Sequence, residues 1–206
     1  MPVTITSVRS TSAERVSIAL DNGQEIKMTL SAAAELRLYA GKQLEERELE
    51  TLRSSAALSL CKNRALELLS YRPMSQKELR DKLVQKGEES QIAEASVQWL
   101  AEQGFLNDET YAGMVARHYA AKGYGQGRVR QELRRRGIDR SLWENAVEEM
   151  PDPDDKLERF LAARLKDPGD RDQVRKVSAA LLRRGYSWEE IHTALARHCA
   201  EIEEEE

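Results

Sequence analysis

The stretch RVRQELRRRG, residues 128–137, shows how the chain is built, because its pattern occurs three times. The same pattern stands as ELRDKLVQKG at 78–87 and as KVSAALLRRG at 176–185. In each copy a leucine lies four positions before the final glycine, an apolar residue lies four positions earlier, and a lysine or arginine directly precedes the glycine. Residues four apart share one face of an α-helix, and glycine adopts the left-handed conformation that commonly ends one. The pattern therefore predicts three copies of an amphipathic helix with a glycine stop.

A helix on each side completes each predicted repeat. The preceding helices are expected at 63–70, 109–121 and 154–165, and the apolar spacing after each glycine predicts a following helix. The candidate N-caps of these helices are Asp108, Ser90, Asp139 or Ser141, and Ser187. Three short helices bury too little apolar surface alone, so neighbouring repeats should stack. We expect an all-α core of three tandem three-helix repeats in an elongated, curved array.

The segment before the repeats has a different pattern. Residues 3–8, 15–20 and 24–30 are rich in β-branched side chains and partly alternate, and Asp21-Asn22-Gly23 is a tight-turn signal. We expect a small ribbon of two or three strands that packs on a helix, since so few strands are not stable alone. A short helix capped by Ser31 and a charged helix near 45–53 should follow.

These patterns predict a division of the chain. A β-rich extension occupies 1–55, the three repeats occupy 56–107, 108–150 and 151–200, and an acidic tail occupies 201–206. Pro151-Asp152-Pro153 is a strong helix stop between the second and third repeats.

Composition restricts the kinds of protein that this chain can be. No apolar run approaches the ~18 residues that a membrane span needs, and the opening residues are too polar for a secretory signal. Two cysteines without a pairing pattern suit a reducing compartment, so we expect a cytoplasmic protein. His192 and Cys199 share a helix face, but a zinc site needs three or four ligands. We find no catalytic arrangement, and we expect no enzyme, no metal and no cofactor.

The glycines of GYGQG, residues 123–127, resemble a phosphate-binding loop only superficially. Such a loop follows a buried strand and carries a Lys-Ser/Thr pair, whereas here a helix precedes and that pair is absent. We interpret the segment as a flexible connector between helices.

The basic residues form the candidate binding face. The net charge is −4, yet residues 122–140 hold seven Lys/Arg against two acidic residues. With Val129 and Leu133 facing inward, the arginines of this helix should occupy its solvent side, where a merely solubilising face would mix charges. A solvated face remains the alternative to binding of a polyanion or an acidic partner. The candidate residues are Lys77, Arg80, Lys82, Lys86, Lys122, Arg128, Arg130, Arg134, Arg135, Arg175, Lys176, Arg183 and Arg184.

Three long stretches carry a resemblance to a known family. They are RALELLSYRPMSQKELRDKLVQKG at 64–87, WLAEQGFLNDETYA at 99–112 and KGYGQGRVRQELRRRGID at 122–139. Together they resemble, in order, the motifs of the RecX family of bacterial recombination regulators. The resemblance is strong over about residues 60–150 and weaker over 151–200, and the first 55 residues lie outside it.

The resemblance implies both a fold and a function. Members of the family have three three-helix repeats and bind the RecA recombinase, chiefly in the groove of its filament on single-stranded DNA. They curb its ATPase, strand-exchange and coprotease activities, which places them in DNA repair, recombination and the SOS response. They are not enzymes, need no cofactor, and in many cases bind DNA weakly. The resemblance gives no individual binding residues, so the candidates above rest on charge and helical geometry.

Two other functions stay open on the residues alone. The helix pairs joined by tight glycine turns also suit a stand-alone DNA-binding protein, and the stacked repeats suit a helical adaptor that binds only proteins. We expect a monomer that has no contact with a membrane.

Overall fold

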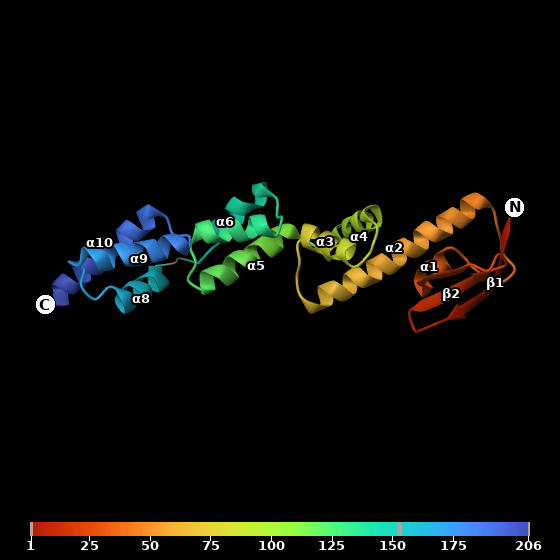
Figure 1. Cartoon of the computed structure of the whole chain (residues 1–206), viewed down its shortest axis with the longest axis horizontal. Coiled ribbons are helices and arrows are strands. Elements are labelled where there is room, and N and C mark those ends of the chain that lie inside the picture. The colour runs from red at the N-terminus through yellow and green to blue at the C-terminus, as the bar shows by residue number, and fades with distance from the viewer. Residues whose placement is uncertain (1, 152–153, 206) are drawn as a thin grey trace. The chain divides into compact units, whose positions relative to one another are not determined.

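The computed structural model describes residues 2–151 and 154–205 of the chain, which divides into two compact units, Met1–Leu106 and Asn107–Glu206. The first unit holds the β-rich extension and the first repeat, and the second holds the second and third repeats (Figure 1). The predicted stop at Pro151–Pro153 lies partly outside the described residues.

Four antiparallel strands form the sheet of the first unit: β1 (Val3–Ser10), β2 (Arg15–Leu20), β3 (Glu25–Thr29) and β4 (Gln43–Leu44). Their order in the sheet is β3-β2-β1-β4. The first three confirm the predicted strands, and Gly23 turns the chain between β2 and β3 with a φ of 83°. The prediction missed β4, because two residues are too short to show an alternating pattern.

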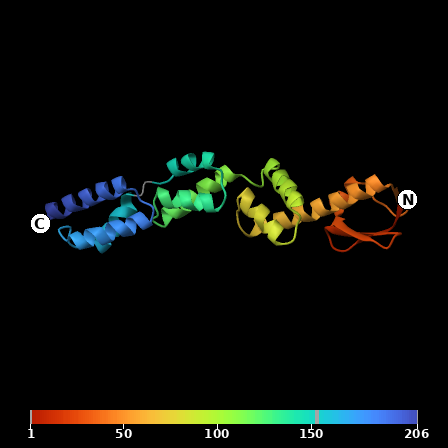
Figure 2. The same cartoon turned by 45° about the horizontal axis from the view of Figure 1, so that its top comes forward.

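The sheet is stabilised by one long helix, α2 (Glu46–Tyr71), which lies along its apolar face (Figures 1 and 2). Leu49, Leu52 and Ala56 of α2 pack in one buried cluster with Ile5 and Ile18 of the sheet. The short helix α1 (Leu30–Glu35) contributes Ala33 to this cluster.

Helix α2 also continues into the first repeat. Its later residues Cys61, Ala65 and Leu68 pack with Leu79 and Leu83 of that repeat. The prediction of two separate helices near 45–53 and 63–70 was therefore wrong. No glycine or proline interrupts the sequence between them, and both cores bury apolar residues of the same helix.

The three repeats have the predicted helices. The first adds α3 (Gln76–Gln85) and α4 (Ser90–Glu102) to the end of α2. The second comprises α5 (Asp108–Ala121), α6 (Gln126–Arg135), the 3-10 turn η1 (Arg140–Leu142) and α7 (Trp143–Glu148). The third comprises α8 (Asp154–Arg164), α9 (Arg171–Arg183) and α10 (Trp188–Glu205), so that α10 includes most of the predicted acidic tail.

The glycine stops are confirmed in all three repeats. Gly87, Gly137 and Gly185 have φ values of 94°, 68° and 89°. In each repeat, the glycine amide bonds the carbonyl three residues earlier, and the next amide bonds the carbonyl of the repeat's leucine. Those leucines, at 83, 133 and 181, are each 0% exposed. One local rule, an apolar stripe ended by a left-handed glycine, thus builds the same helix and turn three times.

Helix caps follow the predictions only in part. Asp139 and Ser187 accept the expected backbone hydrogen bonds, from Ser141 and Glu190. For the other three helices the cap is one or two residues earlier than predicted. The caps are Thr29 instead of Ser31, Asn107 instead of Asp108, and Glu89 instead of Ser90.

Candidate polyanion-binding face

Helix α6 fixes the direction of the central arginines. Val129 and Leu133 are 0% exposed and anchor one side of α6 in the core of the second repeat. Arg134 and Arg135 are exposed, whereas Arg128 and Arg130 are half-buried at the edges of the helix. The structure therefore brings the four arginines onto the outer half of α6, as the spacing predicted, but only two of them are exposed.

A buried carboxylate inside this face was not expected. Glu132 is only 4% exposed, and it accepts a hydrogen-bonded ion pair from Arg135 at 2.8 Å and another ion pair from Arg128 at 3.0 Å. Burial by itself raises the pKa of Glu132, but the hydrogen bond and charge of Arg135, helped by Tyr119 and Arg128, outweigh burial and lower it. Glu132 thus stays ionised and holds two arginines in fixed positions.

Arg130 is held from a neighbouring helix. Its guanidinium donates to both carboxylate oxygens of Glu144 in α7, with a shortest distance of 2.8 Å. These hydrogen bonds raise the pKa of Arg130 and lower that of Glu144. Among the described polar side chains of α6, only Arg134 has neither an ion pair nor a hydrogen bond. Its charge is the one that α6 presents without a local counterion.

The candidates of the first unit lie on α3 and at its C-cap, which is Lys86. Lys77 lies 3.8 Å from Asp81, and Arg80 lies 2.9 Å from Asp81 and 3.5 Å from Glu94. Lys82 is half-buried and Lys86 is exposed, and neither forms an ion pair within the described part of the chain. About half of the predicted charge on α3 is therefore balanced locally.

The candidates of the third repeat fall into two groups. Lys176 and Arg183 are exposed, and Arg175 lies 3.1 Å from Asp172 with a side chain that is 78% exposed. Arg184 behaves differently, because its guanidinium lies over the rings of Phe160 and Tyr124, at 4.7 and 5.7 Å from their centroids.

Arg184 belongs to a contact between the second and third repeats. It donates a hydrogen bond to the carbonyl of Gly123 at 3.2 Å, and its own carbonyl accepts one from Gly125 at 3.0 Å. The amide of Gly127 donates to the carbonyl of Gly185 at 2.9 Å. Lys122, which precedes this segment, is exposed.

The glycines of GYGQG are therefore a packing surface. A Cβ atom on Gly125 would lie 2.5 Å from the Gly185 carbonyl oxygen, and one on Gly185 would lie 2.2 Å from the Arg128 amide nitrogen. The interpretation of this segment as a flexible connector needs correction, because its backbone donors are used by the third repeat. The spacing of glycines at 123, 125 and 127 was the available signal, since close backbone approach is one of the reasons for glycine.

Two further observations describe the site's surroundings. None of the helices in the described ranges is long and apolar enough to cross a bilayer. Across those same residues, His, Cys, Asp and Glu side chains nowhere gather in a group of three or more that would suit a metal ion.

The amino-acid sequence of this chain is similar to those of known regulatory proteins. A family model described as RecX, first three-helix domain, matches residues 61–100, and one described as RecX, second three-helix domain, matches residues 107–147. Regulatory protein RecX of Vibrio vulnificus is 38% identical over 140 residues, which are 66% of this chain and 91% of that protein.

Solved structures agree with the fold. A crystal structure of regulatory protein RecX superposes with a TM-score of 0.76 at 23% identity, and covers 95% of this chain and 99% of the other. The crystal structure of RecX from Lactobacillus salivarius superposes with a TM-score of 0.62 at 25% identity, over 70% of this chain and 97% of the other. On the sequence match above all, the chain belongs to the RecX family of regulatory proteins.

Proposed function

We propose that this chain binds RecA assembled on single-stranded DNA, lodges in the groove of that filament, and inhibits its ATPase, strand-exchange and coprotease activities. Membership of a family of regulatory proteins supports a regulator. The outer face of α6 supports this mode of binding. Four arginines cluster on it, and Arg134 has no local counterion among the described residues. In this proposal the protein acts in the cytoplasm as a monomer and catalyses no reaction.

The arginines suit a target that carries fixed anionic groups. A guanidinium forms two parallel hydrogen bonds with a phosphate or a carboxylate. Glu132 and Glu144 hold three of the four guanidinium groups, so those three lose little conformational freedom when a target arrives. Arg134 supplies the charge that no acidic side chain of α6 neutralises.

A stand-alone DNA-binding role is the second candidate. It is favoured by candidate cations that form no ion pair among the described residues, because such groups release counterions from phosphates on binding. These cations include Lys82, Lys86, Lys122, Arg134, Lys176 and Arg183. The net charge of −4 opposes strong attraction to bare DNA, which is why the protein–DNA filament is the preferred target. A protein-only adaptor would bind RecA equally well without DNA.

The test is the ATPase rate of the cognate RecA on single-stranded DNA, with this protein added at substoichiometric amounts. A progressive fall in the rate supports the proposal. An unchanged rate with fully active RecA contradicts it. Binding to RecA without DNA, and to DNA without RecA, measured in parallel, separates the filament regulator from the adaptor and from the DNA-binding protein.

A matched pair of variants tests the α6 face. Arg130, Arg134 and Arg135 are replaced together by Gln, which keeps the side chains polar. The control replaces Arg9, Arg15 and Lys27, three exposed cations of the sheet, and removes the same number of charges. We expect the α6 variant to weaken filament binding and to flatten its dependence on salt, while the control retains both. Equal behaviour of the two variants would show that only the overall charge matters.

A further inference from the structure

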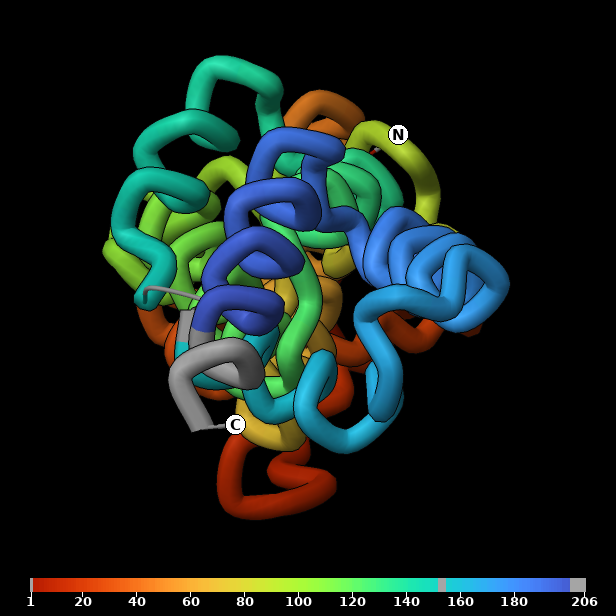
Figure 3. Tube along the Cα trace, turned by 90° about the vertical axis from the view of Figure 1, so that its left-hand side faces the viewer, coloured from red at the N-terminus to blue at the C-terminus, as the bar shows by residue number. Residues whose placement is uncertain are grey.

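The third repeat carries a surface groove that the basic face does not explain. Its volume is about 650 Å³, and it is lined by Pro168, Arg171, Val174, Arg175, Ser178, Ala179, Leu182 and Trp188. These residues come from α9, from the turn before it and from the start of α10. Helices α9 and α10 lie side by side in Figure 3. Trp188 is 65% exposed, although a tryptophan normally buries most of its large apolar surface.

The floor of the groove is apolar. Val174, Ala179 and Leu182 of α9 are half-buried, and Val174 and Leu182 also pack against the core of the third repeat. The hydroxyl of Ser178 donates to the carbonyl of Val174 at 2.8 Å, so it offers no free donor to the groove. Exposed apolar surface of this kind, with a polar edge, is typical of a site that another molecule covers.

The same place in the second repeat is basic. When the repeats are aligned on Gly137 and Gly185, Ser178 corresponds to Arg130, Leu182 to Arg134, and Trp188 to Arg140. At these three positions the second copy presents arginines where the third presents serine, leucine and tryptophan, whereas Arg171 and Arg175 of the third copy correspond to Gly123 and Gly127. Two equivalent faces with such different chemistry are suited to different parts of a target.

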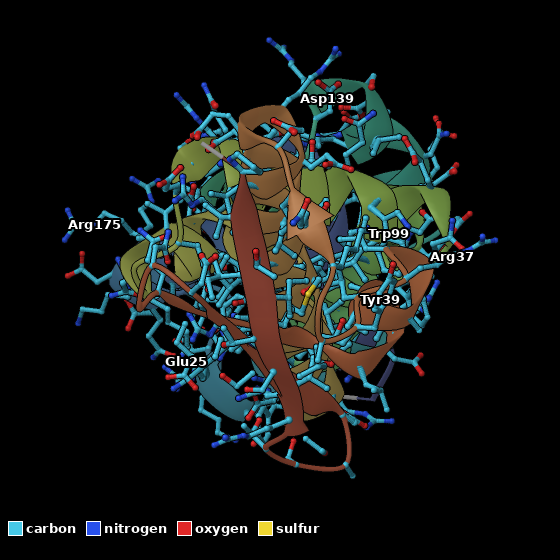
Figure 4. The ribbon with its side chains drawn as sticks, turned by 90° about the vertical axis from the view of Figure 1, so that its right-hand side faces the viewer. Glu25, Arg37, Tyr39, Trp99, Asp139 and Arg175 are labelled. Atoms are coloured by element: carbon cyan, nitrogen blue, oxygen red, sulfur yellow. The ribbon has the colours of Figure 1, made fainter. Side chains whose placement is uncertain are left out.

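The arginines at the edge of the groove favour an occupant that carries negative charge. Arg171 is exposed and forms no ion pair with another described residue, and Arg175 extends away from the ribbon in Figure 4. Asp172 pairs with Arg175, but that arginine side chain remains 78% exposed. Four other carboxylates lie close in sequence. Asp167 and Asp170 accept backbone amides in the turn before α9, and Glu190 accepts the amide of Ser187. Glu189 is exposed at the start of α10. Of the two lining cations, neither is buried, so both remain available to carboxylates of a partner.

The chain's own acidic end does not reach this groove along its helix. Trp188 is the first residue of α10, and α10 runs as one helix to Glu205. At ~1.5 Å per residue, the helix carries its far end about 25 Å away from Trp188. The acidic end of the chain is therefore not the occupant of the groove.

We propose that this groove binds a protein segment that inserts a bulky apolar side chain beside Trp188 and Leu182 and places carboxylates against Arg171 and Arg175. The inference rests on the proposed function for the identity of the partner, which would be a surface segment of RecA. It assigns a protein contact to the third repeat, while α6 of the second repeat meets anionic groups.

The first test uses synthetic helical peptides as probes and does not involve RecA. One peptide carries leucines on one face and glutamates beside them, and its twin carries lysines in place of the glutamates. Binding is followed by calorimetry and by the blue shift of tryptophan emission. We expect the glutamate peptide to bind at least about tenfold more tightly than its twin, and Trp188→Ala to lose about tenfold or more of that affinity.

Two further variants keep the test decisive. Arg171→Glu with Arg175→Glu leaves the groove walls in place and should reverse the preference between the two peptides. Tyr71→Ala removes another exposed aromatic ring, 77% exposed, and should change nothing. Equal binding of the two peptides, no binding, or unaltered binding to Trp188→Ala would overturn the proposal.

A second experiment, which measures binding to the RecA–DNA filament, distinguishes this proposal from the proposed function. RecA–DNA filament that binds the unaltered chain but loses affinity for Trp188→Ala supports both proposals. Filament binding that is insensitive to Trp188→Ala refutes the groove's role alone. Peptide binding without any RecA binding leaves an acidic-peptide site and refutes the proposed function. A dimer that dissociates in Trp188→Ala, seen by sedimentation, would show that a second copy covers the groove and would overturn the proposal.

Discussion

The amide of Gly127 donates a hydrogen bond to the carbonyl of Gly185 at 2.9 Å, so the second and third repeats meet through backbone atoms. The amide of Gly125, two residues earlier, donates a similar bond to the carbonyl of Arg184. The close approach needs glycine at 125 and 185, because a Cβ atom at either position would overlap the opposing backbone, and a Cβ on Gly127 would lie only 3.0 Å from the Gly185 carbonyl oxygen.

Gly185→Ala should disrupt this contact. The new Cβ would lie 2.2 Å from the Arg128 amide nitrogen, and the residue has a φ of 89°. We expect a loss of ~3 kcal/mol or more, from the strained conformation together with the overlap. Hydrogen exchange at the Gly125 and Gly127 amides, measured by NMR, should rise sharply.

Gly87→Ala is the matched control for that substitution. Gly87 ends the equivalent helix of the first repeat with a φ of 94°, but a Cβ there would meet nothing within 4 Å. Its cost should be the conformational penalty alone, about 1–2 kcal/mol. Equal costs for the two alanines would mean that the backbone contact contributes nothing to stability.

Arg134→Gln should affect filament binding more than Arg128→Gln does. Arg134 is exposed without an ion pair among the described residues, whereas Arg128 is already held by Glu132 at 3.0 Å. We expect the Arg134 change to reduce the slope of log affinity against log salt concentration by about 1. A salt titration of filament binding for both single variants provides the measurement. A larger loss of slope for Arg128→Gln would place the target contact at the other edge of α6.

Glu132→Gln should destabilise the second repeat in a pH-dependent way. The arginines lower the pKa of Glu132 in the folded chain below its usual value of 4.5, so its contribution is complete above the unfolded pKa and is lost as the pH falls through the folded pKa. We expect a loss of ~1–3 kcal/mol at neutral pH, because a buried charged hydrogen-bond acceptor is replaced by a neutral one.

Urea unfolding of both chains between neutral pH and about pH 3 tests this dependence. The difference between wild type and Glu132→Gln should be constant near neutrality and should shrink below about pH 4.5. A difference that does not change with pH would show that the ionised form of Glu132 is not what stabilises α6.

The three repeat leucines should be equally sensitive to truncation. Leu83, Leu133 and Leu181 are each 0% exposed in the core of their own repeat. Replacement by alanine should cost about 2–5 kcal/mol at each position, the range for a fully buried leucine. Leu182→Ala, at a half-buried neighbour, should cost clearly less when the unfolding of all four variants is followed by circular dichroism. Equal losses at positions 181 and 182 would contradict the assigned inward direction of the stripe.

The sequence alone determined the repeating element of this protein. The i, i+4 apolar stripe and the left-handed glycine act within one helix and its turn, so Leu133 and Gly137 predict their own surroundings. The same local geometry correctly placed the arginines on the outer half of α6. The resemblance to the RecX family came from long ordered motifs, and the comparisons confirmed it.

Only the tertiary structure decided which of those residues are held and by what. The sequence shows Glu132 only as an acidic residue between arginines. The packing of α6 buries its carboxylate and makes it the counterion of Arg128 and Arg135. The continuity of α2, the pairing of Gly127 with Gly185 and the groove beside Trp188 all depend on segments distant in sequence or on surfaces left uncovered. Apart from the glycine spacing at 123, 125 and 127, these features leave no periodic trace in the chain, because they are set by which elements meet and not by the conformation of any one element.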